Sequence, residues 1–208
     1  LGSGPTWLPG GKGANQAVAA ARQGATTTMI GQVGDDDAGR SLIALLTAEG
    51  GDVRRVRTAA GLATGTALIT VDPSGVNTLV VAPAANHALA PHHVDADVVA
   101  EAAVLVVQLE VPLETVVHAL TVARAAGVRP LLNASPSRPL DLGVMGLVDV
   151  LVVNEAEAAA IGPRTSAPAI LVTRGERGVA VTEHGETLGQ NGSDQLLLGS
   201  ALDLVGAE

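Results

Sequence analysis

The sequence lacks cysteine, phenylalanine and tyrosine, and its only tryptophan is Trp7. Without cysteine, the chain can form neither a disulfide framework nor a cysteine zinc site, and it has no thiolate nucleophile. This absence fits a reducing compartment, and we expect a cytoplasmic protein. Without Phe and Tyr, the core must be built from Ala, Val, Leu and Ile, which bury less area per residue than aromatic rings do.

Positive charge is also scarce, since 12 Lys and Arg residues face 21 Asp and Glu residues and give a formal net charge of -9. Such a charge repels nucleic-acid phosphates and anionic lipids, so we expect neither a nucleic-acid partner nor a membrane partner. No apolar run reaches the roughly 18 residues that a bilayer-spanning helix needs. Because 47% of the residues are hydrophobic and only 16% are charged, the composition predicts a packed globule, and we expect a single α/β domain over residues 1–208.

Short apolar segments that alternate with helical patterns indicate the fold class. Residues 104–107 are wholly apolar and residues 148–153 mostly so, while residues 113–120 between them carry apolar side chains at helical spacing. Apolar strands between helices are typical of a parallel sheet. Residues 170–172 continue the series, and residues 154–168 leave room for only a short helix. The pattern predicts an α/β fold with a mostly parallel sheet.

The first part of the chain adds two further patterns. An Ala-rich stretch over residues 14–23, followed by Gly24, predicts a helix, and residues 26–30 predict a short strand. Residues 66–71 and 77–82 are β-rich and are separated by a turn that contains Pro and Gly. This arrangement predicts a hairpin, and therefore a small β appendage beside the main sheet.

The segment LPGGKGANQAVAAAR, residues 8–22, joins a Gly-rich loop to the predicted Ala-rich helix. Small residues let a backbone close on a polyhydroxylated ligand, and Lys12 and Asn15 can donate hydrogen bonds to its hydroxyls. The segment closely resembles the first signature of the ribokinase-like (phosphofructokinase B) sugar kinases. It is not a P-loop, because no Ser or Thr follows Lys12. The resemblance implies that Gly11, Lys12 and Asn15 bind a sugar; the simpler alternative is an ordinary Gly-rich loop before a helix.

Two β-rich segments resemble the lid of the same family. In ribokinases, strands that correspond to residues 64–69 and 77–81 cover the sugar together with the residues before Gly10. The resemblance implies a three-layer α/β/α fold with a small β lid over about residues 1–9 and 64–82. The fold is expected to be incomplete, because most of the first lid strand is absent. The resemblance also implies a homodimer formed through the lid.

The segment Pro-Ala-Ala-Asn, residues 83–86, matches the family's Pro-Gly-Ala-Asn element. Ala84 stands where the family has glycine. Since glycine allows backbone conformations that alanine disfavours, we expect this replacement to alter the backbone at Ala84.

Two acidic segments allow alternative interpretations. Asp35, Asp36 and Asp37 lie in a segment that resembles the family's Val-Gly-x-Asp-x-x-Gly element. They could hold a metal ion, but Asp residues just before a helix more often cap it, and we favour the cap. Glu110 lies in Val-Gln-Leu-Glu-Val-Pro, which resembles the end of the family's central strand and implies that Glu110 contacts the sugar. By itself, Glu110 is equally well explained as a charge at a helix entry.

The segment Asn154-Glu-Ala-Glu157 matches the family's Asn-x-x-Glu motif. The resemblance implies that Asn154 lies near ATP and that Glu157 binds magnesium through water. An alternative that is compatible with this role is a capping box, with Asn154 as N-cap and Glu157 at the third helical position. Residues 172–178 resemble the family's nucleotide-binding Thr-x-Gly-x-x-Gly stretch, which implies that Thr173, Gly175 and Gly178 contact the nucleotide.

The last residues match the family's catalytic motif poorly. The family's Asp-Thr-Thr-(Gly/Ala)-Ala-Gly-Asp corresponds here to residues 203–208, so the catalytic base is expected just after Glu208 and no catalytic residue is assigned. Asp203 matches a ligand of a monovalent cation, such as potassium. Leu204 and Val205 replace both Thr residues, and Glu208 replaces a Gly of the anion hole, where a carboxylate repels phosphate.

Two functions from different classes follow from the resemblance. The first is a kinase that phosphorylates a pentose with MgATP, with ribose and ribose 5-phosphate as the expected substrate and product. Fructokinase and nucleoside kinase are alternatives within the same family. The second is a catalytically inactive remnant that still binds a sugar or a nucleotide.

Overall fold

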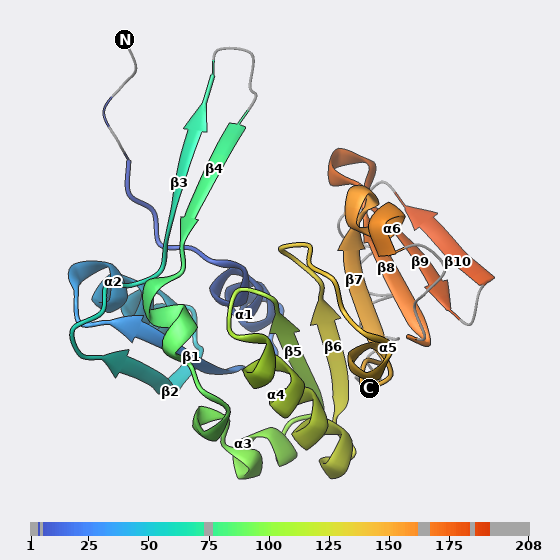
Figure 1. Ribbon diagram of the computed structural model, residues 1–208, viewed down its shortest axis with the longest axis horizontal. Coiled ribbons are helices and arrows are strands. Elements are labelled where there is room, and N and C mark those ends of the chain that lie inside the picture. The colour runs from blue at the N-terminus through green and yellow to red at the C-terminus, as the bar shows by residue number, and fades with distance from the viewer. Residues whose placement is uncertain (1–3, 5, 73–76, 162–166, 184–185, 192–208) are drawn as a thin grey trace. The chain divides into compact units, whose positions relative to one another are not determined.

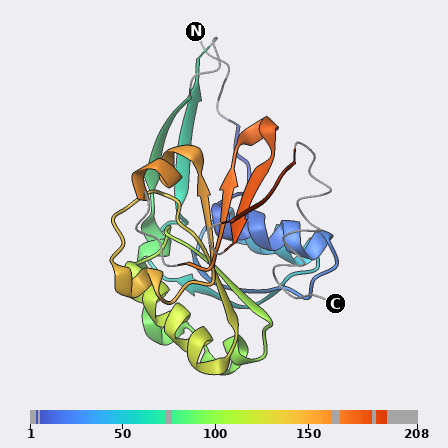
Figure 2. The ribbon, with the colours of Figure 1, turned by 90° about the vertical axis from the view of Figure 1, so that its right-hand side faces the viewer.

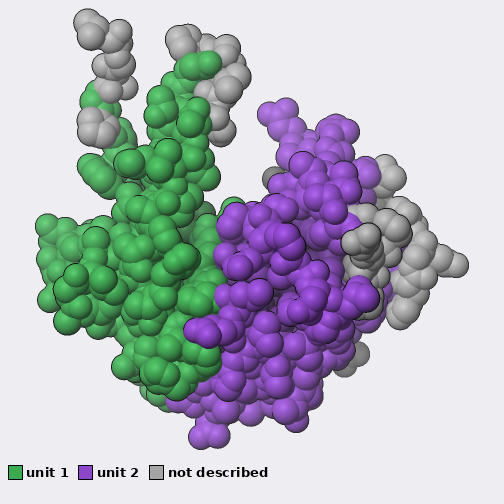
Figure 3. Space-filling view, in the orientation of Figure 1, with its two compact units in different colours: residues 1–93, 110–112 green, residues 94–109, 113–208 purple. Residues whose placement is uncertain are grey.

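The computed structural model describes residues 4, 6–72, 77–161, 167–183 and 186–191. The chain divides into two compact units, coloured in Figure 3. Unit 1 comprises residues 1–93 and 110–112, and unit 2 comprises residues 94–109 and 113–208. A single domain over the whole chain stays a prediction.

The described residues of unit 1 form two α-helices, two parallel strands, an antiparallel strand pair and two short 3-10 helices, which can be followed in Figure 1. In chain order they are α1 (Lys12–Arg22), β1 (Thr28–Gly34), α2 (Asp37–Ala48), β2 (Asp52–Ala59), β3 (Thr66–Val71), β4 (Asn77–Ala82), η1 (Ala84–Ala88) and η2 (Pro91–His93).

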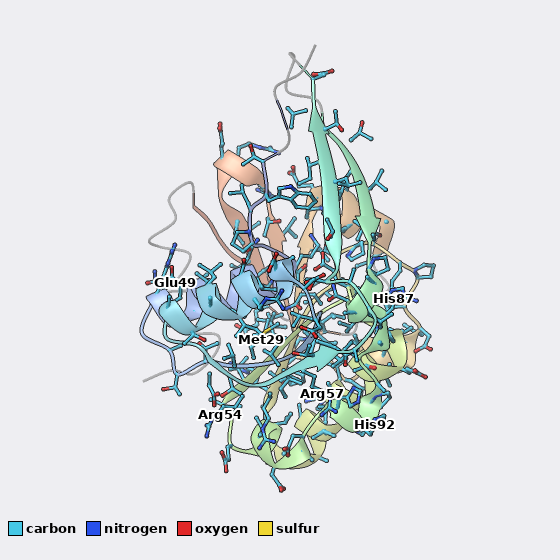
Figure 4. All side chains as sticks on the ribbon, turned by 90° about the vertical axis from the view of Figure 1, so that its left-hand side faces the viewer. Met29, Glu49, Arg54, Arg57, His87 and His92 are labelled. Atoms are coloured by element: carbon cyan, nitrogen blue, oxygen red, sulfur yellow. The ribbon has the colours of Figure 1, made fainter. Side chains whose placement is uncertain are left out.

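The helices of unit 1 pack on the parallel pair β1–β2. Val33 on β1 and Leu46 on α2 are buried in its core. Arg22 near the end of α1 forms an ion pair of 2.5 Å with Glu49 just after α2 (Figure 4). Arg22 is mostly exposed and Glu49 is half-buried, so the pair contributes little stability, but it connects the C-terminal ends of the two helices.

The hairpin formed by β3 and β4 projects away from the helices of unit 1 (Figures 1 and 2). Leu68 pairs with Val80, and the next register pair is Ile69 with Leu79. Because successive residues of a strand face opposite sides, both faces of the hairpin carry large apolar side chains. All four side chains are more than half exposed. A two-stranded hairpin of this kind buries little of its own apolar surface.

In the described part of unit 2, six strands form one sheet, with helices between the parallel strands. In chain order its elements are α3 (Ala96–Ala100), β5 (Val104–Gln108), α4 (Leu113–Ala126), β6 (Arg129–Asn133), α5 (Leu142–Met145), β7 (Val150–Asn154), α6 (Glu155–Ile161), β8 (Ala169–Thr173), η4 (Gly175–Arg177), β9 (Val179–Glu183) and β10 (Glu186–Asn191).

The strand order in this sheet is β10-β9-β8-β7-β6-β5. The pairings from β5 to β8 are parallel, and those of β9 with β8 and β10 are antiparallel. Leu120 on α4, Leu132 on β6 and Leu151 on β7 are almost completely buried. The largest buried side chains of the unit are therefore aliphatic, as the lack of Phe and Tyr requires.

The predicted elements agree with these, with some additions. The helix predicted over residues 14–23 is α1, and the short connection before β8 contains the short helix α6. Three strands, β2, β9 and β10, were not predicted. The lid was predicted to include about residues 1–9. Of these, residues 4 and 6–9 are described, and they form no strand. Among the described helices, none combines the length and the apolar character that a membrane crossing requires.

Candidate functional site

The start of α1 brings together three of the residues predicted to bind a sugar. The backbone N of Lys12 donates a hydrogen bond of 3.1 Å to Oε2 of Glu110, which lies 98 positions further along the chain. Gly11, the N-cap residue, has no side chain to cap the helix. A Cβ atom at Gly11 would lie 4.0 Å from Oε2 of Glu110. Glu110 therefore supplies the missing cap from a distant segment, and its negative charge suits the helix dipole.

Asn15 lies on the first turn of the same helix. Its backbone N donates to the carbonyl of Gly11 at 2.9 Å, and the residue is exposed. Lys12 and Glu110 are half-buried. An ammonium group, an amide and a carboxylate at one helix start supply both donors and acceptors, which is what recognition of several hydroxyl groups requires.

Asp36 is a helix cap, as the sequence analysis favoured. Its Oδ1 accepts from the backbone N of Gly39 at 2.9 Å and from Oγ1 of Thr64 at 2.5 Å, and its Oδ2 accepts from the backbone N of Thr64 at 2.8 Å. These bonds, those from Thr64 first, hold the pKa of Asp36 below its usual value. Asp35 and Asp37 instead pair with Arg40. In the described part of the chain, no group of three or more His, Cys, Asp or Glu residues could hold a metal ion.

Thr64 connects this cap to the base of the hairpin. Its Oγ1 also accepts from the backbone N of Gly34 at 2.9 Å, and the residue is buried. A Cβ atom at Gly34 would lie 2.4 Å from the carbonyl O of Leu62, closer than any real Cβ contact. Gly34, the first glycine of the Val-Gly-x-Asp-x-x-Gly element, is therefore required for the close approach of residues 62–64. A local sequence pattern does not indicate this close approach, because the contacting segment lies far along the chain: Thr64 is 28 positions from Asp36, to which it bonds.

Ala84 lies where the chain leaves β4. Its φ of 42° is in the left-handed region that favours glycine. We expected alanine to alter the backbone here, yet the residue retains a conformation typical of glycine. The following residue explains why, since the backbone N of Ala85 donates to Ala63 at 3.0 Å and the Ala85 carbonyl accepts from Nε2 of Gln32 at 3.3 Å. Surrounding hydrogen bonds impose the conformation on Ala84.

In unit 2, Asn154 and Glu157 form the predicted capping box. Oδ1 of Asn154 accepts from the backbone N of Glu157, and Oε2 of Glu157 accepts from the backbone N of Asn154, both at 2.8 Å. Glu157 is buried, with 7% of its surface exposed. Asn154 is the register partner of Thr173 on β8, whose Oγ1 donates to the carbonyl of Val153 at 3.3 Å. Asn154 and Thr173 thus lie side by side at the carboxyl ends of two parallel strands, where open α/β sheets bind ligands.

The turn after β8 carries the last two predicted nucleotide contacts. Gly175 and Gly178 have φ values of 58° and 80°, and the turn closes with a hydrogen bond of 2.8 Å from the backbone N of Arg174 to the carbonyl of Gly178. Glu155, which the sequence analysis did not select, lies against this turn. It pairs with Arg177 at 2.5 Å and lies 3.6 Å from Nε of Arg174.

Asp203, the predicted cation ligand, lies outside the described residues. The same holds for Leu204, Val205 and Glu208, the last of which precedes the expected base. Their roles stay predictions from the sequence.

The chain is similar in sequence to known carbohydrate kinases. Residues 2–193 match the model of the pfkB family carbohydrate kinases. Among curated proteins, the bifunctional ribokinase/ribose-5-phosphate isomerase A of Fructilactobacillus sanfranciscensis is 40% identical over 154 residues, which cover 73% of this chain and 28% of that protein. The ribokinase of Staphylococcus aureus is 38% identical over 151 residues, which cover 72% of this chain and 50% of that protein.

The structure of Arabidopsis thaliana ribokinase complexed with ribose and ATP has the same fold. It superposes with a TM-score of 0.82 at 22% identity, over 96% of this chain and 75% of that one. The predicted α/β fold with a mostly parallel sheet is confirmed. The chain spans half or less of the length of the two curated relatives. On the extent of the family match, the chain belongs to the pfkB family of carbohydrate kinases.

Proposed function

We propose that the chain belongs to an ATP-dependent kinase that phosphorylates a pentose, with ribose as substrate and ribose 5-phosphate as product. The observation that carries this proposal is the bond between the Glu110 carboxylate and the start of α1, because it brings the predicted sugar residues together. The two curated relatives named above are ribokinases or contain one.

At the sugar end, each residue has a distinct task. The Glu110 carboxylate accepts from sugar hydroxyls, while Lys12 and Asn15 donate to them. Gly11 leaves room next to the carboxylate, because a Cβ atom there would lie 4.0 Å from Oε2. Binding several hydroxyls at fixed positions holds the sugar in one orientation, which lowers the entropic cost of the reaction.

At the nucleotide end, Asn154 and Thr173 contact ATP, and the backbone of Gly175 and Gly178 approaches its phosphates. The buried carboxylate of Glu157 suits magnesium, which usually keeps several waters and binds through few carboxylates. Magnesium neutralises negative charge on the phosphates. Since the Glu157 carboxylate is fixed by the Asn154 amide, it can order water around the ion without a direct bond to it. A potassium ion at Asp203 completes the proposed set of ions.

The alternative, an inactive protein that binds a sugar or a nucleotide, is favoured by the sequence at residues 204–208. There Leu204, Val205 and Glu208 replace residues that the family uses around the phosphate. One assay separates the two functions. ADP production in the presence of ribose, MgATP and potassium refutes the inactive alternative, whereas ribose binding measured by calorimetry without ADP production refutes kinase activity for this chain.

The substrate is tested by the same assay with fructose, adenosine and deoxyribose in place of ribose. The proposal predicts the highest kcat/KM for ribose. A higher value for adenosine or fructose assigns the chain to another activity of the same family. The cytoplasm is the proposed location, since the chain contains no cysteine and ATP is its proposed substrate.

We further propose a homodimer formed through the hairpin of β3 and β4. Both of its faces expose apolar side chains, among them Ile69, which is 61% exposed, and Leu79, which is 56% exposed. Burying exposed apolar surface of this kind favours association. A dimer in analytical ultracentrifugation that becomes a monomer in the variant Ile69→Glu supports the proposal, and a wild-type monomer at high concentration refutes it.

A further inference from the structure

Glu155 connects α6 to the turn that follows β8, and we propose that it is a positioning residue for the phosphates of the nucleotide. In this proposal, Glu155 acts through Arg174 and Arg177, which contact the phosphates. The inference rests on the nucleotide site proposed above, but it assigns roles to three variable positions that the Asn-x-x-Glu and Thr-x-Gly-x-x-Gly motifs leave open.

The position of Glu155 is fixed by its neighbour. It follows Asn154 directly and is the first residue of α6, in the turn that the Asn154–Glu157 capping box closes. Each of its two carboxylate oxygens faces a different guanidinium group. Oε2 accepts from Nη2 of Arg177 at 2.5 Å, and Oε1 lies 3.6 Å from Nε of Arg174.

The backbone of the turn is closed without help from Glu155. The backbone N of Arg174 donates to Gly178 at 2.8 Å, that of Gly178 donates to Gly175 at 3.0 Å, and that of Arg177 donates to Arg174 at 3.2 Å. These bonds fix the path of the chain but not the two long cationic side chains. Because Arg174 and Arg177 carry like charges within one turn, they repel each other unless an anion lies between them.

Fold stability alone does not account for this arrangement. Arg177 is 70% exposed and Glu155 is 47% exposed, and exposed ion pairs of this kind contribute little to stability. The place of these ion pairs, next to the proposed nucleotide site, explains them better. Thr173, directly before the turn, is the register partner of Asn154 at the carboxyl ends of β8 and β7.

Guanidinium groups are well suited to phosphate oxygens, because they donate several hydrogen bonds in one plane. The chain has only 12 Lys and Arg residues, and two of them lie in this turn. Arginine side chains have many rotamers, and holding them in place before the ligand arrives lowers the entropic cost of binding. Glu155 provides this restraint for both arginines at once.

The test compares nucleotides that differ in the number of phosphates. Dissociation constants of the Glu155→Gln variant for MgATP, MgADP and adenosine are measured by calorimetry. We expect the affinity for MgATP and MgADP to fall about tenfold, because the arginines that Glu155 no longer restrains form weaker hydrogen bonds to the phosphates. The affinity for adenosine, which has no phosphate, should be unchanged. The matched control is Glu176→Gln, which removes an exposed carboxylate from the same turn. The ion pairs described for this turn join Glu155 to Arg174 and Arg177.

A second variant tests whether Glu155 acts through the arginines. Replacing both Arg174 and Arg177 with Met should weaken MgATP binding, and adding Glu155→Gln to that variant should have no further effect. Thermal unfolding followed by circular dichroism verifies that each variant is folded, and if Glu155→Gln does not fold, the Arg177→Met single variant is measured against the same nucleotides.

Three results would overturn the proposed role of Glu155 without affecting the proposed nucleotide site. They are an unchanged affinity for MgATP, a tighter one from removal of a repelling carboxylate, and an equal loss for adenosine, which indicates a merely structural role. If the unaltered chain binds none of these nucleotides while it binds ribose, the proposed nucleotide site itself fails, and this role fails with it.

Discussion

Glu110 and Glu157 are both carboxylates that accept a hydrogen bond from the backbone at the start of a helix, but they reach that position by different routes. Glu157 bonds to Asn154, three residues before it, whereas Glu110 bonds to Lys12, 98 residues before it. The first bond forms as soon as α6 forms. The second requires that distant segments of unit 1 have already folded, at a cost in loop entropy. The Asn154–Glu157 part of the proposed nucleotide site is therefore built locally, whereas the proposed sugar site depends on long-range packing.

The largest expected loss of stability comes from a substitution that disrupts the long-range packing of unit 1. In the variant Gly34→Ala, the new Cβ atom would lie 2.4 Å from the carbonyl O of Leu62 and 2.5 Å from the backbone N of Thr64. Neither backbone atom can move without separating β1 from the base of the hairpin. We expect the free energy of unfolding to fall by about 3 kcal/mol, measured by urea denaturation.

The control for this variant is Gly10→Ala. No heavy atom lies within 4 Å of a Cβ atom at Gly10, and its φ is not positive. We expect its urea midpoint to stay close to that of the unaltered chain. Equal midpoints for Gly34→Ala and Gly10→Ala would contradict the close approach of residues 62–64 to Gly34.

The next effect concerns the local side. Glu157→Gln keeps an oxygen that can accept from Asn154, since Gln also serves in capping boxes. Glu157→Ala loses that bond and leaves a gap at a buried position. We expect Glu157→Ala to lower the free energy of unfolding by about 1–2 kcal/mol and Glu157→Gln by less than about 0.5 kcal/mol.

Binding of MgATP distinguishes the role of Glu157 as a helix cap from its proposed role in ordering water around magnesium. Both variants lack the charge, so both should bind MgATP about tenfold more weakly than the unaltered chain if Glu157 orders the magnesium waters. The measurement is a calorimetric titration of ATP with and without magnesium. If Glu157→Gln binds MgATP as tightly as the unaltered chain does, Glu157 is a cap and nothing more.

Glu110 permits the same pair of substitutions on the long-range side. Glu110→Gln can still accept from Lys12, but it loses the favourable interaction with the dipole of α1, and Glu110→Ala loses both. We expect losses of about 0.5 and 1 kcal/mol in the free energy of unfolding, respectively. The rise in Tm that ribose causes in the unaltered chain should disappear in Glu110→Ala. A ribose effect of unchanged size would remove Glu110 from the sugar site.

The sequence predicted what is encoded locally. The Ala-rich helix, the hairpin and the apolar parallel strands all follow from short patterns, and so does the Asn154–Glu157 capping box. Strand β2 was missed, because Arg54, Arg55 and Arg57 interrupt its apolar pattern. Arg54 and Arg57 are labelled in Figure 4.

Contacts between distant positions could not be predicted in this way. Nothing near Asp36 indicates that Thr64 is its partner, and nothing near Glu155 indicates Arg177, which lies 22 positions away. The resemblance to a family did select Glu110 for the sugar site. It did not reveal that the same carboxylate caps α1, because that function depends on the geometry of the folded unit.

The smallest expected effect tests how firmly long-range contacts impose a local conformation. Ala84 adopts a φ of 42°, which costs an alanine about 1 kcal/mol relative to glycine. Ala84→Gly removes that cost but makes the unfolded chain more flexible, which offsets about half of the gain. We therefore expect a net increase of about 0.5 kcal/mol in the free energy of unfolding. Ala88→Gly, in the same 3-10 helix but without a positive φ, should instead destabilise by about 0.5–1 kcal/mol. If both variants are destabilised equally in urea denaturation, Ala84 bears no strain, and the hydrogen bonds of Ala85 do not impose its conformation.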